Sequence, residues 1–115
     1  MSEPLFSPQA ILLQSLLMDL EAELRTTGLW SEQPPAAEAF ASEEPFCIDT
    51  MEFADWLQFV FISRLQFLIE QQQDLPSRCG IAPYAEMFWQ GRLSSFTELL
   101  RILQAIDRLL DASAE

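Results

Sequence analysis

Apolar residues recur every three to four positions over most of this chain, which is the spacing of one face of an α-helix. The first such stripe begins after Ser7, a good N-cap, and Pro8, which fits the first turn of a helix. It stops before Gly28, a typical residue just past a helix end. Glu21 and Arg25, one turn apart, are expected to pair on the outer side. The stripe predicted to be buried is Leu13, Leu16, Leu17, Leu20 and Leu24.

The stretch 51–70 is apolar on almost every side and predicts a central helix over about 50–72. Asp49 and Glu52 fit a capping box at its start. A helix with so little polar surface is expected to be contacted by several others. On a wheel at about 100° per residue, one narrow polar stripe remains, made of Glu52, Asp55, Ser63, Gln66 and Glu70.

A short helix is expected near the motif PYAEMFWQ. Pro83 is predicted to begin it and Gly91 to close it. Trp89 points away from the predicted inner face and is therefore a candidate for exposure. The inner face is expected to consist of Tyr84, Met87 and Phe88.

The last helix is predicted to open with a capping box over 95–98, from Ser95 to Glu98. No stretch of the chain shows strand-like alternation or an internal repeat. We therefore predict an all-α protein, a compact bundle of four helices, three long and one short, in a single domain over 1–115. The stripe of the last helix is Phe96, Leu99, Leu100, Leu103, Ile106 and Leu110.

A long acidic and proline-rich connection, residues 29–48, separates the first two helices. Its three prolines and four glutamates, without any basic residue, are compatible with disorder. Its aromatic residues instead favour a segment that lies on the bundle and keeps a mobile acidic middle. Trp30, Phe40 and Phe46 are expected to hold it in place. Short tails are predicted at 1–6 and 112–115.

The charge balance is strongly acidic, with six arginines, no lysine or histidine, 18 acidic residues and a net charge of −12. An acidic surface repels phosphate groups, which disfavours direct binding to nucleic acid or to an anionic membrane. We therefore expect the partner, if there is one, to be a protein with a basic surface. Net negative charge also keeps a protein soluble, and this role alone would explain the excess of acidic residues.

Few residues in this chain suit catalysis or metal binding. Cys47 and Cys79 lie outside any metal-ligand spacing, so we expect reduced thiols that are buried or half-buried. The absence of histidine excludes Ser-His and Cys-His pairs and imidazole ligands for zinc. No phosphate-binding loop or dinucleotide fingerprint occurs. We therefore expect no enzyme activity, no cofactor and no metal, and rate catalysis by Asp and Glu alone lowest.

The N-terminal stretch has no basic n-region, and no uncharged apolar run is long enough to span a membrane. The expected location is therefore the cytoplasm.

Between 45 and 87 the chain carries short motifs in a fixed order, with these residues: Asp49, Thr50, Met51, Trp56, Leu57, Gln58, Arg64, Pro76, Pro83, Tyr84 and Glu86.

Taken together, these motifs resemble the YqcC-like family of small bacterial proteins. The resemblance implies a small helical bundle without an assigned function, whose genes often lie beside one for a tRNA pseudouridine synthase. Ser63 stands where many members carry proline, so no proline kink is expected in the central helix.

Arg64 falls on the apolar side of the central helix, opposite its polar stripe. Burying a lone charge is costly, so the guanidinium must either meet a carboxylate or reach water. Glu86 is the first candidate partner and Asp107 the second, and either ion pair would fix how two helices dock. The alternative is a pocket between the second and third helices in which Arg64 holds an anionic ligand, lined by Tyr84 and Trp56.

The leading functional hypothesis is an acidic accessory module that binds a basic protein, with an RNA-modifying enzyme as the partner that the family's gene context favours. The alternative is the small anionic-ligand binder around Arg64. We expect a monomer or a weak homodimer. Phe59 falls inside the polar stripe of the central helix, where Phe40 or Trp30 of the connection could cover it; uncovered, Phe59 and Trp56 would form an aromatic anchor for a partner. The candidates for the partner surface are Trp30, Phe40, Phe59 and Trp89.

Overall fold

The computed structural model of this protein describes residues 7–77 and 79–112. The tails predicted at 1–6 and 112–115 lie outside the described residues, except that Ala112 belongs to the last helix. Every regular element in the described ranges is helical, and no strand occurs there. The predicted all-α class is therefore confirmed.

Helix α1 (Pro8–Thr26) forms as its end signals predict. The Ser7 side chain accepts a hydrogen bond from the Ala10 amide at 3.1 Å, which caps the first turn. Gly28 follows the helix with a φ of 79°, a conformation that favours glycine. Of the predicted stripe, Leu16 is half-buried and the other four leucines are buried.

The central helix runs without a break through three elements, α2 (Phe53–Trp56), η3 (Leu57–Ile62) and α3 (Ser63–Glu70). The predicted capping box at its start does not form. Asp49 lies before the helix and accepts a hydrogen bond from the Ser42 hydroxyl at 2.5 Å. Glu52 is the N-cap residue but makes no side-chain cap.

The middle of the central helix, η3, is π-helical rather than α-helical. A π turn contains an extra residue, so each position after it lies about 100° back from where a regular α-helical wheel would place it. This rotation keeps one continuous buried face, which consists of Phe53, Ala54, Leu57, Gln58, Phe61, Ile62, Leu65 and Ile69. Arg64 turns away from that face and is exposed.

Helix α4 (Ile81–Phe88) begins two residues before Pro83, where the sequence predicted its start. The reason is a cap from another element, because the Asp107 carboxylate accepts hydrogen bonds from the amides of Ile81 at 2.9 Å and Ala82 at 2.8 Å. Such a cap satisfies amides that have no partner within their own helix. Pro83 therefore sits within the first turn, where a proline is tolerated.

The face that α4 buries also differs from the prediction. Ile81, Ala82 and Ala85 are buried, whereas Tyr84 is 44% and Met87 56% exposed. Trp89, predicted to be exposed, is only 3% exposed. Ile81, Ala85 and Trp89 recur at the spacing of one helical face, and this face packs on the core. Phe88 is half-buried against the core.

Helix α5 (Thr97–Ala112) follows a single 3₁₀ turn, η4 (Leu93–Ser95). The predicted capping box does not form here either, because Ser95 belongs to that turn and the Glu98 carboxylate pairs with Arg101. The predicted apolar stripe of this helix is buried in full.

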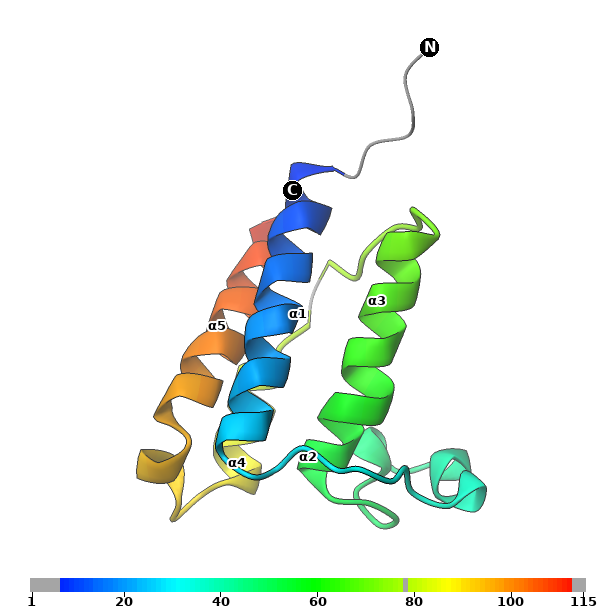
Figure 1. Cartoon of the computed structure of the whole chain (residues 1–115), viewed down its shortest axis with the longest axis vertical. Helices are drawn as coiled ribbons and strands as arrows, with labels where there is room; N and C mark the ends of the chain where they lie inside the picture. Colours follow the sequence, from blue (N-terminus) through cyan, green and yellow to red (C-terminus); the bar gives the residue numbers. More distant parts are fainter. Residues whose placement is uncertain (1–6, 78, 113–115) are drawn as a thin grey trace.

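The central helix and helices α1, α4 and α5 assemble around one core. Helix α1 lies along α5, α4 packs against α5, and α3 lies beside α1 (Figure 1). At the lower end of the central helix, Phe53 of α2 stacks on Phe88 of α4 with ring centroids 4.7 Å apart. The connecting segment, residues 29–48, holds two short 3₁₀ helices, η1 (Ala37–Ala41) and η2 (Pro45–Cys47). It runs across the lower end of the central helix in Figure 1 and forms a lobe beside it.

Candidate partner-binding groove

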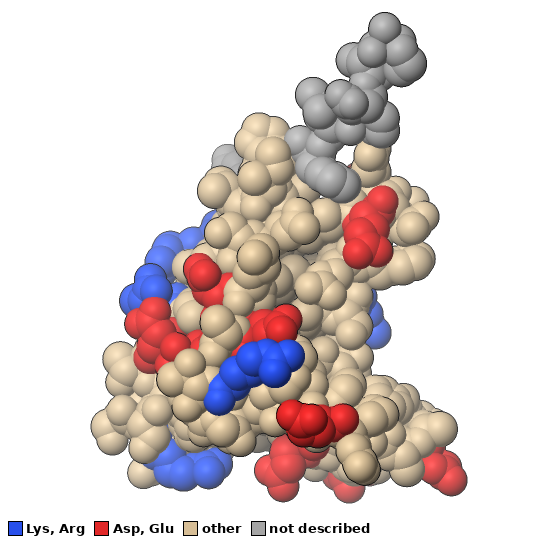
Figure 2. Space-filling view, viewed as in Figure 1, with Lys and Arg blue, Asp and Glu red and all other residues tan. Residues whose placement is uncertain are grey.

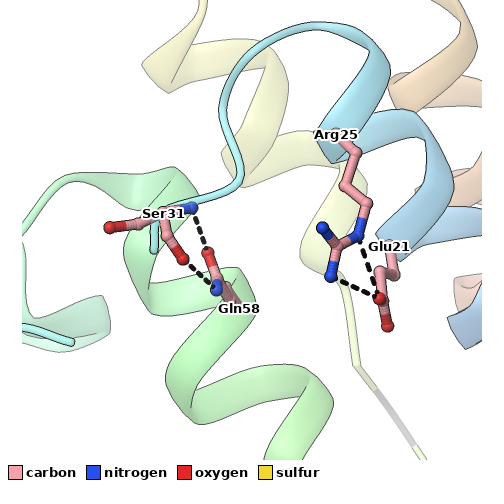
Figure 3. A network of polar contacts seen from close by, with 4 residues as sticks. All are labelled: Glu21, Arg25, Ser31 and Gln58. Carbon is pink, nitrogen blue, oxygen red and sulfur yellow. Dashed lines mark hydrogen bonds and ion pairs between the residues drawn. The ribbon is translucent and has the colours of Figure 1, made fainter. Parts of the chain in front are cut away.

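The connecting segment is attached to the central helix at its start by Gln58. This side chain is the buried polar residue of the described core, and it is only 7% exposed. Its amide oxygen accepts a hydrogen bond from the Ser31 backbone N–H at 2.8 Å, and its amide group donates to the Ser31 carbonyl at 2.9 Å (Figure 3). Both polar ends of a buried amide are thus satisfied, which removes the cost of burying it.

The far end of the connecting segment is attached by Asp49 and Thr50. The Thr50 hydroxyl donates a hydrogen bond to the Ala39 carbonyl at 2.7 Å, and Asp49 accepts from Ser42. Gln58, Asp49 and Thr50 all belong to the motifs noted in the sequence. Gln58 attaches the connection to the central helix, whereas Asp49 and Thr50 attach it to the segment just before that helix. No local pattern in the sequence indicated these contacts.

Phe46 lies at the centre of an aromatic cluster. Its ring centroid is 4.5 Å from that of Tyr84, 4.9 Å from Trp56 and 5.9 Å from Phe88. Phe46 and its neighbour Cys47 both have positive φ angles, 59° and 50°. A left-handed conformation is costly for residues with a side chain, so packing must compensate for it.

A groove of about 660 Å³ lies between the connecting segment and the central helix. One wall is the 40–47 part of the connection and the other is a face of the helix between Trp56 and Phe67. We call this the aromatic groove. Its lining residues are Phe40, Ser42, Glu44, Phe46, Cys47, Trp56, Phe59, Val60, Ser63, Arg64 and Phe67.

Arg64 does not form the ion pair expected from the sequence. Its side chain is exposed, as is Glu86, and the ion pairs among the described residues are Arg25–Glu21 and Arg101–Glu98. Asp107, the second candidate, caps α4 instead. The π turn accounts for the difference, because a regular wheel places Arg64 on the apolar side.

The pocket expected between the second and third helices is placed differently. Arg64 and Trp56 both line the aromatic groove, but its second wall is the connecting segment and not α4. Tyr84 does not line the groove and touches it only through the ring of Phe46.

The four aromatic residues predicted as candidates for the partner surface differ in how far they are exposed. Trp30 is half-buried, packs against the core and lies under the Arg25 guanidinium, whose carbon is 4.6 Å from the ring centroid. Trp89 is buried, which corrects the prediction. Phe59 is half-buried and Phe40 is 41% exposed, and both line the aromatic groove. The connection is thus held by Trp30 and Phe46 as expected, while Phe40 is left open; the mobility of its acidic middle stays a prediction.

The remaining motif residues support the fold in different ways. Leu57 is buried, Met51 is half-buried, and Pro76 and Pro83 are exposed. Both cysteines are free thiols, with Cys47 buried and Cys79 half-buried, as predicted.

Cys79 lies beside the carboxylate of Asp107. Burial, followed by the charge and hydrogen bonding of Asp107, raises the pKa of the Cys79 thiol from its ordinary 9.0 to about 12. This thiol therefore stays protonated at neutral pH and is a poor nucleophile. In the same direction, burial and the nearby Glu52 raise the pKa of Asp55.

Two further findings concern the described residues as a set. No group of three or more Cys, Asp or Glu side chains among them is placed to hold a metal ion. None of their helices combines the length and the apolarity that crossing a bilayer requires.

Comparison with known proteins places this chain among bacterial relatives. Residues 12–109 match the family DUF446, described as tRNA pseudouridine synthase C. The chain belongs to the DUF446 family. The uncharacterized protein YqcC of Escherichia coli K12 is 44% identical over 99 residues, which cover 84% of this chain and 91% of YqcC. An uncharacterized protein of Haemophilus influenzae Rd is 46% identical over 87 residues, covering 76% of this chain and 78% of that protein.

The solution structure of YqcC from Escherichia coli has the same fold as this DUF446 chain. The two superpose with a TM-score of 0.81 at 34% identity, over 90% of this chain and 89% of YqcC. A third relative is much longer. The tRNA pseudouridine synthase C of Pectobacterium carotovorum is 40% identical over 76 residues, which are 66% of this chain but 20% of that protein.

Proposed function

We propose that this chain is a non-catalytic accessory module that binds a tRNA pseudouridine synthase. The observation that carries the proposal is the Pectobacterium relative, in which a region similar to this chain makes up 20% of a protein named tRNA pseudouridine synthase C. Two regions in one polypeptide meet at a high effective concentration. Fusion of the two regions therefore favours a joint function, and we infer that the separate chain and the separate enzyme bind each other for the same function.

The charge of the chain supports the same partner. An enzyme that binds tRNA needs a basic surface to neutralise phosphates, and the net charge of −12 on this chain complements such a surface. Acidic side chains gather on the lower right of the face in Figure 2, without a basic side chain among them. The module would then contact the enzyme and leave the tRNA to it.

The test is direct binding between the purified chain and the purified tRNA pseudouridine synthase of the same organism, measured by calorimetry. We expect a stoichiometric complex whose affinity weakens as NaCl rises from about 50 to about 300 mM, because salt screens complementary charges. Free tRNA serves as the control and is expected not to bind the chain.

Two outcomes would count against the proposal. No heat of binding to the enzyme at the lower salt concentration would reject the synthase as the partner. Binding of tRNA without the enzyme would show that the acidic module reads nucleic acid directly.

A further inference from the structure

We propose that the aromatic groove is the surface that binds the synthase. Its occupant is a short segment of that enzyme with an apolar or aromatic centre, and with Lys or Arg on the side that faces the connecting segment. This inference rests on the function proposed above and adds the site and the chemistry that it recognises.

The shape of the groove fits a polypeptide segment. Its helical wall extends from Trp56 to Phe67, which is roughly 16 Å at the rise of an α-helix. That length matches about three turns of helix, or about five residues of extended chain.

The groove offers aromatic surface that the fold itself leaves open. Phe40 is 41% and Phe67 58% exposed, and they lie on opposite walls of the groove. Phe46, Trp56 and Phe59 also line the groove and are half-buried. Aromatic side chains in a concave surface are the usual centres of binding energy in protein interfaces.

The charges around the groove specify which segment fits. Residues 31–55 contain seven acidic residues and no basic one, and all of the seven except Asp55 are exposed. Glu44 belongs to the wall formed by the connection, so a basic flank is favoured on that side. Arg64 is the cation of the opposite wall and has no ion-pair partner among the described residues, so it is open to a carboxylate of the same segment.

The wall formed by the connection is attached to the rest of the protein by hydrogen bonds and by ring contacts. Asp49 and Thr50 attach it through Ser42 and Ala39, and Phe46 anchors it in the aromatic cluster despite its left-handed backbone. A wall that is already in place loses little conformational entropy when a segment binds.

The first experiment removes aromatic surface on both walls. We expect Phe40→Ser/Phe67→Ser to weaken binding to the synthase at least about tenfold. The matched control is Ile11→Ser/Met18→Ser, which removes two exposed apolar side chains from the outer face of α1, and it is expected to change affinity less than about twofold. All four substituted side chains are exposed, so we expect every variant to fold. Thermal unfolding of each variant checks this.

The second experiment tests the charge. Glu43→Arg/Glu44→Arg is expected to weaken binding at least about tenfold and to reduce its salt dependence. Asp19→Arg/Asp111→Arg makes the same change in net charge on exposed positions of α1 and α5, and is expected to have a smaller effect.

The outcomes separate this inference from the proposed function. If the unmodified chain binds the synthase and both groove variants bind equally well, the groove is not the site, although the function stands. If only Arg64→Ala weakens binding, the groove holds an anionic group and not a basic segment. If Phe40→Ser/Phe67→Ser instead converts a dimer of this chain into a monomer, the occupant is a second copy. If the synthase does not bind at all, both proposals fail together.

Discussion

At the scale of single residues, a few polar side chains determine where distant segments attach. Gln58 fixes the start of the connection through Ser31, and Asp107 fixes the start of α4 through two backbone amides. Each of these contacts satisfies a polar group that would otherwise be costly to bury. Burial keeps the Cys79 thiol protonated, and Asp107 adds to this because its carboxylate disfavours a second negative charge beside it.

The raised pKa of Cys79 predicts a loss of stability at alkaline pH. In the unfolded chain the thiol titrates near 9.0, whereas in the folded protein it titrates near 12. The folded state therefore holds the proton that the unfolded state has lost, and this contribution to stability is present below pH 9 and lost as the pH rises toward 12. Urea unfolding of the unmodified chain and of Cys79→Ser, compared at increasing pH, measures it.

The difference in unfolding free energy between these two chains is expected to shrink over that pH range. Effects of pH that are common to the two chains cancel in the difference. A difference that stays constant with pH would mean that Cys79 is accessible and ionises normally in the folded protein.

At the scale of elements, the π turn decides which side of the central helix faces the core. Phe53 and Ala54 before it, and Leu65 and Ile69 after it, are aligned on one buried face because η3 contains an extra residue. Without that extra residue, every position after η3 would lie about 100° further around the helix.

This predicts that a single deletion is tolerated within η3 and not beyond it. Deleting Phe59 should convert the π turn into α-helix and keep Leu65 and Ile69 in the core, at a cost of about 1 kcal/mol for its own lost contacts. Deleting Gln66, an exposed residue of α3, should rotate Ile69 out of the core and cost at least about 2 kcal/mol more. Urea unfolding measures the free energy of unfolding of both deletion variants. Equal losses of unfolding free energy would contradict the role given to η3.

At the scale of the whole molecule, the net charge of −12 acts against folding. Like charges are closer together in the folded chain than in the unfolded chain, so their repulsion destabilises the compact state. The described ion pairs, Arg25–Glu21 and Arg101–Glu98, are both on the surface and compensate little of it.

Salt should therefore stabilise this protein. Raising NaCl to about 0.5 M shortens the screening length to a few ångströms, and each 1 kcal/mol gained raises Tm by about 4–8 °C in a domain of this size. We expect Tm to rise by several degrees in calorimetry. A Tm that falls with NaCl would show that attractive ion pairs outweigh the repulsion.

The sequence by itself determined the parts of this protein that depend on neighbours along the chain. Ser7 and Gly28 mark the ends of α1, and the leucines of α1 and α5 recur at the spacing that a buried face requires, so both helices could be predicted from local patterns. The pairing of Glu21 with Arg25 follows from the same spacing. The motifs between 45 and 87 also identified the family correctly.

Only the tertiary structure decided where the candidate site lies. The π turn moved Arg64 from the predicted interior to the wall of the groove, and the Asp107 cap moved the start of α4. The face of α4 that packs on the core includes Trp89 and leaves Tyr84 exposed. Gln58, Asp49 and Thr50 gained their roles by meeting the connection. The roles of Gln58 and Asp107 depend on contacts between residues 25 or more positions apart in the sequence. Periodicity within one helix carries no information about such contacts or about where a π turn interrupts the α-helix.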